Sequence, residues 1–160
     1  MILWWAAFAA EAAPPSASPP APPPPLCAEP AAPPAGLEAW GRPVPATRSI
    51  MAGTAADLML ADVVDLRWAT PPARAPIGGT YGAVLSVTIW RAGQYRLALS
   101  ARASVALVKD GRPVAAGAVS GGPPCSGIRQ IVDYRLKPGQ YALQLSGAAG
   151  PEMTLLLVAP

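Results

Sequence analysis

Apolar and polar residues alternate at every second position in four segments of the chain, all of them after Leu37. A two-residue period is typical of β-strands with one face toward a core and the other toward solvent. The residues predicted to point inward are Leu85, Val87 and Ile89; Tyr95, Leu97 and Leu99; Val132, Tyr134 and Leu136; and Tyr141, Leu143 and Leu145. No stretch of ten residues in this part has a 3.6-residue period without proline or glycine intervening, so we expect no long helix.

A further segment, residues 153–158, is apolar on both of the faces that a strand would present. We expect a strand that is covered on both sides or paired at the centre of a sheet. Asp110-Gly111 separates two apolar runs and predicts a hairpin, because both central residues of the favoured turn need a positive φ. The spacing of these strands and turns predicts an all-β fold: a single antiparallel β-sandwich, jelly-roll-like, with about seven to nine strands over residues 50–160.

The sequence also contains one short internal repeat, which we call the internal echo. Residues 91–100 and 137–146 match at six of ten positions, which form the pattern Gly-Gln-Tyr-x-Leu-x-Leu-Ser. One repeat of this size does not make a repeat protein, but it predicts two strands in equivalent positions of the sandwich.

The N-terminal part differs in composition from the rest. Residues 2–10 are an unbroken apolar run, too short to span a bilayer, and small residues follow it, so we interpret residues 1–12 as a signal peptide. No Lys or Arg precedes the run, and the alternative is a frayed hydrophobic terminus. Residues 13–36 contain eleven prolines and are predicted to be a disordered or extended linker, or else a ligand for an aromatic groove. The domain would then span residues 37–160.

Cys27 and Cys125 are the two cysteines of the chain. In an exported protein the simplest interpretation is a disulfide, here between residues 98 positions apart. The alternative is a redox-active pair with Arg129 as the cation that stabilises a thiolate. The signal peptide and the disulfide together predict a periplasmic or secreted protein without a membrane span in the mature chain.

Composition excludes several kinds of chemistry. The chain has no histidine, which excludes a Ser-His-Asp triad and a His-ligated metal, so we expect no metal and no cofactor. The net charge is +3 at pH 7, and the cations are spread from Arg42 to Lys137 without a cluster. Nucleic-acid binding needs a basic stripe, so we expect no nucleic-acid partner.

The segments Cys125-Ser-Gly-Ile-Arg129 and Val132-Asp-Tyr-Arg-Leu-Lys-Pro-Gly-Gln-Tyr141 carry a resemblance to a family of small exported bacterial proteins. The resemblance extends over about residues 80–146, and this chain departs from it at Gln130, where a lysine is usual. Family members are often labelled homogentisate 1,2-dioxygenase. A non-haem iron oxygenase needs histidine ligands, and this chain has none, so that activity does not carry over to it.

Two groups of residues are candidates for ligand binding. Trp68, Tyr81 and Trp90 would form a stacking platform for a sugar ring, or else pack in the core. Arg129, Asp133 and Arg135 share one face of a predicted strand and would hold a carboxylate or sugar hydroxyls, or else form an exposed ion-pair ladder.

These features predict a non-catalytic exported β-sandwich with a structural or interaction role in the cell envelope. The alternative is a module that binds carbohydrate, such as an envelope glycan, through exposed aromatic residues. The partner would accordingly be a glycan or another envelope protein. An enzyme is the weakest hypothesis, because it needs two carboxylates that converge in one pocket.

Overall fold

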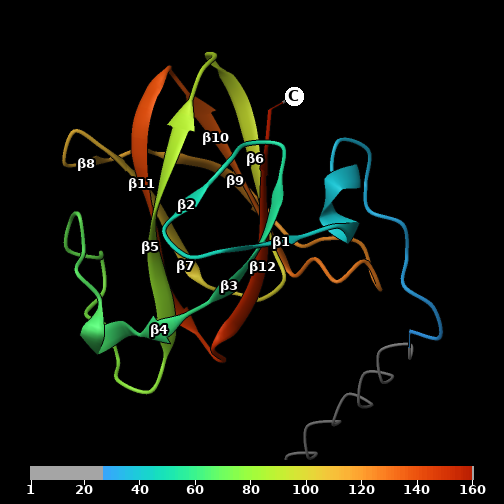
Figure 1. Ribbon diagram of the computed structural model, residues 1–160, viewed down its shortest axis with the longest axis horizontal. Coiled ribbons are helices and arrows are strands. Elements are labelled where there is room, and N and C mark those ends of the chain that lie inside the picture. The colour runs from blue at the N-terminus through green and yellow to red at the C-terminus, as the bar shows by residue number, and fades with distance from the viewer. Residues whose placement is uncertain (1–26, 160) are drawn as a thin grey trace, which may run out of the picture.

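The computed structural model describes residues 27–159, and within them the chain forms two packed six-stranded sheets (Figure 1). Sheet A has the order β1 (Val44–Ala46), β3 (Ala55–Met59), β12 (Glu152–Val158), β6 (Gly93–Leu99), β10 (Gln130–Leu136) and β9 (Ala116–Ser120). Sheet B has the order β2 (Ser49–Ile50), β5 (Tyr81–Ile89), β11 (Gly139–Ala148), β7 (Ser104–Lys109) and β8 (Arg112–Pro113), with β4 (Ala61–Asp62) also paired to β5. The helical elements are two short 3-10 turns, η1 (Glu38–Gly41) and η2 (Val63–Asp65). The expected all-β sandwich is confirmed, whereas the predicted signal peptide and residues 13–26 of the predicted linker lie outside the described residues.

Four of the twelve strands in residues 27–159 are pieces of two or three residues: β1, β2, β4 and β8. Of these, the sequence predicted only β8, as the second arm of the hairpin at Asp110-Gly111. Two of them also depart from the expected antiparallel pairing, because β1 runs parallel to β3 and β2 runs parallel to β5. The segment 44–50 contributes one short edge strand to each sheet. Each piece is too short to produce a visible alternation, and proline interrupts β1 and β8.

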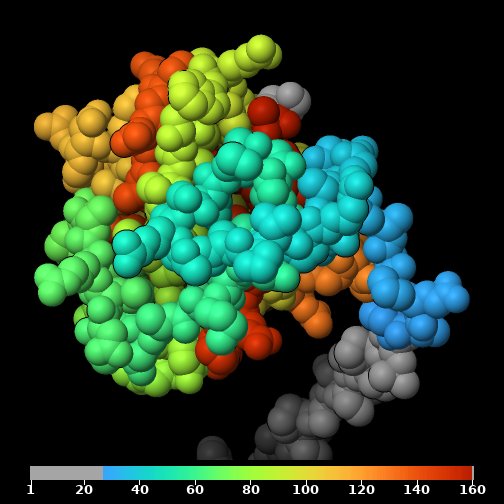
Figure 2. Space-filling view, viewed as in Figure 1, coloured from blue at the N-terminus to red at the C-terminus, as the bar shows by residue number. Residues whose placement is uncertain are grey.

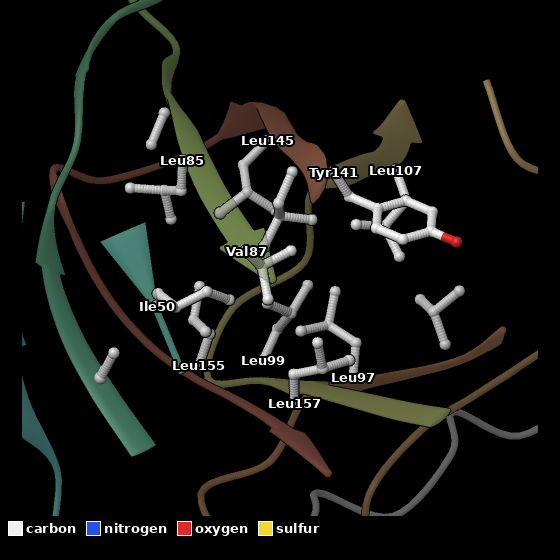
Figure 3. Close-up of a cluster of buried hydrophobic side chains, with 14 of the residues drawn as sticks. Ile50, Leu85, Val87, Leu97, Leu99, Leu107, Tyr141, Leu145, Leu155 and Leu157 are labelled. Atoms are coloured by element: carbon white, nitrogen blue, oxygen red, sulfur yellow. The ribbon is translucent and has the colours of Figure 1, made fainter. Parts of the chain in front are cut away.

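The core lies between the sheets and consists of the alternating residues of the long strands. All twelve residues predicted to point inward are buried. Figure 3 shows side chains from both sheets meeting in this layer, with Leu97, Leu99, Leu155 and Leu157 on one side and Leu85, Val87 and Leu145 on the other. Burial of this apolar surface is the main favourable term in the folding of the domain.

β12 is covered on both faces and pairs between β3 and β6, as its apolar pattern predicted. Leu155 and Leu157 join the central core, whereas Leu156 points to the outer face of sheet A. There it packs in a second buried cluster that also contains Leu37, Ala55, Ala98, Ile128 and Ile131. The segment around η1 therefore covers part of the outer face of sheet A.

The predicted turns and the internal echo are both present. Asp110 and Gly111 have φ values of 51° and 73° and close the hairpin between β7 and β8. The two copies of the echo form β6 in sheet A and β11 in sheet B. In each copy the tyrosine hydroxyl donates a hydrogen bond to the carbonyl four residues earlier: Tyr95 to Arg91 at 2.9 Å and Tyr141 to Lys137 at 2.7 Å.

The predicted Cys27–Cys125 disulfide is present, with the two Cα atoms 5.4 Å apart. The N–H of Ala31 also donates to the carbonyl of Cys125 at 2.8 Å. These contacts attach residues 27–31 to the loop of Cys125 at one end of the sandwich. Ala35 and Gly36 line a hollow with Gln94 and Asp133 of sheet A, and buried Leu37 follows directly. In this part of the chain the structure contains no helix that is long and apolar enough to cross a membrane.

Candidate functional site

One edge of sheet A is formed by β9, the last strand of that sheet. β9 pairs with β10 on one side, and no strand of residues 27–159 lies on its other side. All five residues of β9 are exposed, and Val119 is 63% exposed. An edge of this kind presents backbone N–H and C=O groups that can pair with a further strand.

The local sequence gives this edge neither charges nor prolines. Residues 114–124 contain no charged residue, and no proline lies within β9 itself. The other sheet edges differ: β1 contains Pro45, β8 consists of Arg112 and Pro113, and β2 is two residues long. Prolines, charges, short length and β-bulges are devices by which natural sheets block pairing at an edge. β9 has a modest length and a register irregularity with β10 between Val132 and Tyr134, but it has no proline and no charge.

A groove of about 330 Å³ runs beside β9 and opens between the two sheets. Its apolar lining includes Val119 of β9, Val132 of β10 and Val105 of β7. β8 pairs only with the last two residues of β7, so among the described residues Ser104, Val105 and Ala106 also form a free strand edge. The groove is thus bordered by two unpaired strand edges, one from each sheet.

Two glutamines that line the groove each make a pair of hydrogen bonds to the backbone. Gln130 accepts from the N–H of Ala103 at 3.0 Å and donates to its carbonyl at 3.1 Å. Gln144 is 3% exposed and makes the same pair of bonds to Thr70, both at 2.9 Å. Gln130 therefore fixes the segment that leads into β7, and Gln144 holds the loop 66–74 on the outer face of sheet B. These hydrogen bonds fix the positions of two segments that line the groove.

Tyr134 lies at the inner end of this region. Its side chain is 1% exposed, and its hydroxyl lies 3.5 Å from the carbonyl oxygen of Val105, a long hydrogen bond. Burial disfavours the phenolate and raises the pKa of Tyr134 to about 12.

The three predicted aromatic candidates do not form one surface. Trp68 is partly buried in the loop 66–74 and lines the groove. Tyr81 and Trp90 lie at opposite ends of β5, where Tyr81 packs against the core and Trp90 is 83% exposed. A nine-residue strand is about 30 Å long, so these two rings cannot contact one sugar. A shared platform is ruled out by this separation, and only Trp68 belongs to the groove.

The polar candidates on β10 share a face, as expected, but they do not converge. Asp133 pairs with Arg96 of the neighbouring strand, with Nε and Oδ1 3.3 Å apart. Between Arg129 and Asp133 lies Ile131, which is buried in the cluster beneath η1. Arg129 lies beside the disulfide loop, and Arg135 lies toward the other end of β10. The three residues are therefore spread along the strand.

The described residues also contain a hollow on the outer face of sheet A that includes Asp57 and Glu152. Asp57 accepts a hydrogen bond from the hydroxyl of Thr154 at 2.6 Å, and both carboxylates lie on an open sheet surface. Within residues 27–159 no three His, Cys, Asp or Glu side chains come together as metal ligands would. The groove beside β9 is therefore the candidate binding site.

Comparisons with protein-family models, with curated proteins and with solved structures gave no match for this chain. The described residues form a disulfide-linked, two-layer β-sandwich whose groove is bordered by β9 and by residues 104–106 of β7. Val105 and Val119 were not among the candidates from the sequence. The uncharged stretch 114–124 is a signal that could have found Val119, whereas no local signal singles out Val105.

Proposed function

We propose that this chain is a non-catalytic, exported β-sandwich that acts as an interaction domain in the bacterial cell envelope, periplasmic or secreted. Its binding site is the β9 edge, which accepts an extended segment of another envelope protein as an additional strand. The observation that carries this proposal is a five-residue edge strand that is exposed throughout and has no charge or proline. Strand addition at such an edge is a common mode of peptide recognition.

The groove supports this mode of binding. In an added strand, backbone hydrogen bonds would supply affinity, and every second side chain would point toward the layer between the sheets. Val105, Val119 and Val132 offer an apolar surface for those side chains. We therefore expect the partner segment to carry small or β-branched apolar residues at alternate positions.

Two further observations are consistent with an exported, non-catalytic role. The Cys27–Cys125 disulfide is the kind of bond that persists in an oxidising compartment. The amides of Gln130 and Gln144 in the groove are occupied by the backbone, so they serve to hold its shape.

The proposal is tested by isolating the exported protein from its own host as wild type, as Val119→Lys and as Ile77→Lys. Val119 and Ile77 are both exposed, at 63% and 74%, so neither change should impair folding. We expect one protein to co-purify in stoichiometric amount with the wild type and Ile77→Lys, and to be lost with Val119→Lys. Equal recovery with both variants, or no partner with the wild type, would contradict strand addition.

A second candidate function is binding of an envelope glycan in the same groove. It is favoured by Trp68, which lines the groove together with Arg74, Ser104 and Ser146. An aromatic ring beside hydroxyl and guanidinium groups is suited to a sugar. A glycan screen distinguishes the two functions: loss of a bound glycan with Trp68→Ala but not with Val119→Lys would favour this second function.

A further inference from the structure

The internal echo brings two cations to the same end of the sandwich. Arg91 and Lys137 are the first residues of the two copies, and the carbonyl of each accepts a hydrogen bond from the tyrosine hydroxyl four residues later. Ile89 of β5 lies opposite Gly139, and Gly93 of β6 lies opposite Leu136. The β5–β6 turn and the β10–β11 turn are therefore neighbours.

The hairpin of β7 and β8 joins them at this end. The Nζ of Lys109 donates to the carbonyl of Pro138 in the β10–β11 turn at 2.8 Å, and Arg112 lies opposite Lys109 in the hairpin. Figure 1 shows the two turns at the top of the molecule, with the β8 hairpin beside them. We call this surface the Trp90 end, and it consists of Trp90, Arg91, Lys109, Asp110, Arg112, Arg135 and Lys137.

Five cations and one carboxylate make the Trp90 end strongly basic. The ion pair of the described residues, between Arg96 and Asp133, does not involve any of these five cations. The sequence did not reveal this cluster, because its members come from three separate turns and the strand ends beside them, which meet only in the fold.

Trp90 projects from this basic surface. It directly follows β5 and is 83% exposed, the largest exposed fraction among the large apolar side chains of residues 27–159. In Figure 2 the β5–β6 turn, coloured yellow-green, stands out at the top of the molecule. An exposed indole has an apolar ring and a polar N–H, a combination that favours the boundary between lipid and water.

We propose that the Trp90 end docks on an anionic phospholipid surface. The four exposed cations, Arg91, Arg112, Arg135 and Lys137, would face the lipid phosphates, while Trp90 enters the headgroup layer. A projecting ring suits a flat surface, whereas a sugar site would need a concave surface around the ring. The hydrogen bonds of Tyr95, Tyr141 and Lys109 already hold the three turns in place, so docking needs little ordering of the protein.

This inference goes beyond the interaction at β9. The disulfide and Arg129 lie at the opposite end of the sandwich, since the N–H of Arg129 donates to the carbonyl of Leu99 at the far end of β6 from Gly93. Docking through the Trp90 end would leave the disulfide end pointing away from the lipid.

Co-sedimentation with lipid vesicles tests the charge requirement. The exported, processed protein is mixed with vesicles of phosphatidylcholine alone or of phosphatidylcholine with about one third phosphatidylglycerol. We expect binding only to the anionic vesicles, and weaker binding as salt is raised. The double variant Arg91→Gln/Lys137→Gln should bind about 25-fold more weakly, since each cation near an anionic surface contributes about fivefold.

The matched control is Arg102→Gln/Arg129→Gln, which removes two exposed cations at the disulfide end. It has the same net charge as the first double variant and should retain wild-type binding. Equal weakening by both double variants would show a nonspecific effect of net charge and would overturn the proposal. Equal binding of the wild type to both kinds of vesicle would overturn it as well.

A second measurement tests insertion of the ring. We expect brominated lipid to quench part of the tryptophan fluorescence of the wild type and to quench Trp90→Ser much less. Ile77→Ser, which removes another exposed apolar side chain, should behave like the wild type. Unchanged quenching in Trp90→Ser would show that Trp90 does not enter the lipid and would contradict the proposal.

Discussion

Gln144 illustrates how one side chain can organise a site. Its amide satisfies both the N–H and the carbonyl of Thr70, 74 positions away in the sequence, and it is almost completely buried. The loop 66–74, which carries Trp68 to the groove, is held on sheet B by this pair of bonds. The alternation of β11 predicted that Gln144 points away from the core, but the loop that covers it could not be predicted, because nothing local in the sequence specifies it.

We expect Gln144→Ala to destabilise the protein by about 1–3 kcal/mol, because it leaves two backbone groups of Thr70 without a partner. Chemical denaturation would measure the change, and limited proteolysis should show faster cleavage within residues 66–74. Gln140→Ala is the control, since Gln140 is exposed on the same strand. A loss of stability equal to that of the control would contradict this role for Gln144.

Tyr134 should make the protein sensitive to alkali. Its pKa is raised from 10.0 to about 12, so between these values the unfolded chain loses the phenolic proton while the folded chain keeps it. The stabilisation by the buried phenol is therefore full below pH 10 and declines as the pH rises toward 12. Urea denaturation at pH 9 and pH 11.5 should show a smaller alkaline loss for Tyr134→Phe than for the wild type. The same alkaline loss in both proteins would mean that Tyr134 is not responsible.

At the scale of elements, the long strands were predictable because alternation over five or more residues is unambiguous. The sequence also indicated that residues 153–158 form a strand covered on both faces, but not that Leu37 supplies part of the cover. β9 escaped prediction because its alanine, glycine, valine and serine residues show no alternation. Its importance is visible only from its place at the end of sheet A, which depends on the order of the strands.

Leu37 should be essential to the cover of sheet A. It is fully buried against Leu156, Ala98 and Ile131, and we expect Leu37→Ala to cost about 2–5 kcal/mol. Met59→Ala, at a site that is 73% exposed on the same sheet, should change the unfolding free energy by less than about 0.5 kcal/mol. Similar unfolding free energies for the two variants would show that η1 does not pack as described.

At the scale of the whole molecule, one disulfide connects the segment before η1 to the loop before β10. The fold class and the pairing of Cys27 with Cys125 were predictable, whereas the gathering of cations at the Trp90 end was not. That gathering depends on three turns from both sheets that meet at one end. Charge spacing along the sequence carries no information about it.

Reduction of the disulfide should loosen residues 27–36 and leave the sandwich folded. The closed loop has 98 residue steps, for which chain entropy gives an upper value of about 4–5 kcal/mol. We expect a smaller effect, because residues 27–36 regain freedom in the reduced folded state. Circular dichroism should keep its β signal while a nonspecific protease cuts within residues 27–36. Loss of the β signal on reduction would show that the sandwich depends on the bridge.

The central claim is that the open edge of β9 accepts a partner strand, and site-specific photo-crosslinking in living cells tests it most directly. A photoreactive residue is placed singly at positions 116–120 and, as controls, at the exposed positions of Val44, Met59 and Ile77. We predict crosslinks to one defined protein from the β9 positions, few or none from the control positions, and loss of the β9 crosslinks when Val119→Lys is combined with a probe at position 118. Crosslinks that are equally frequent at the control positions, or absent from all five β9 positions, would contradict the account.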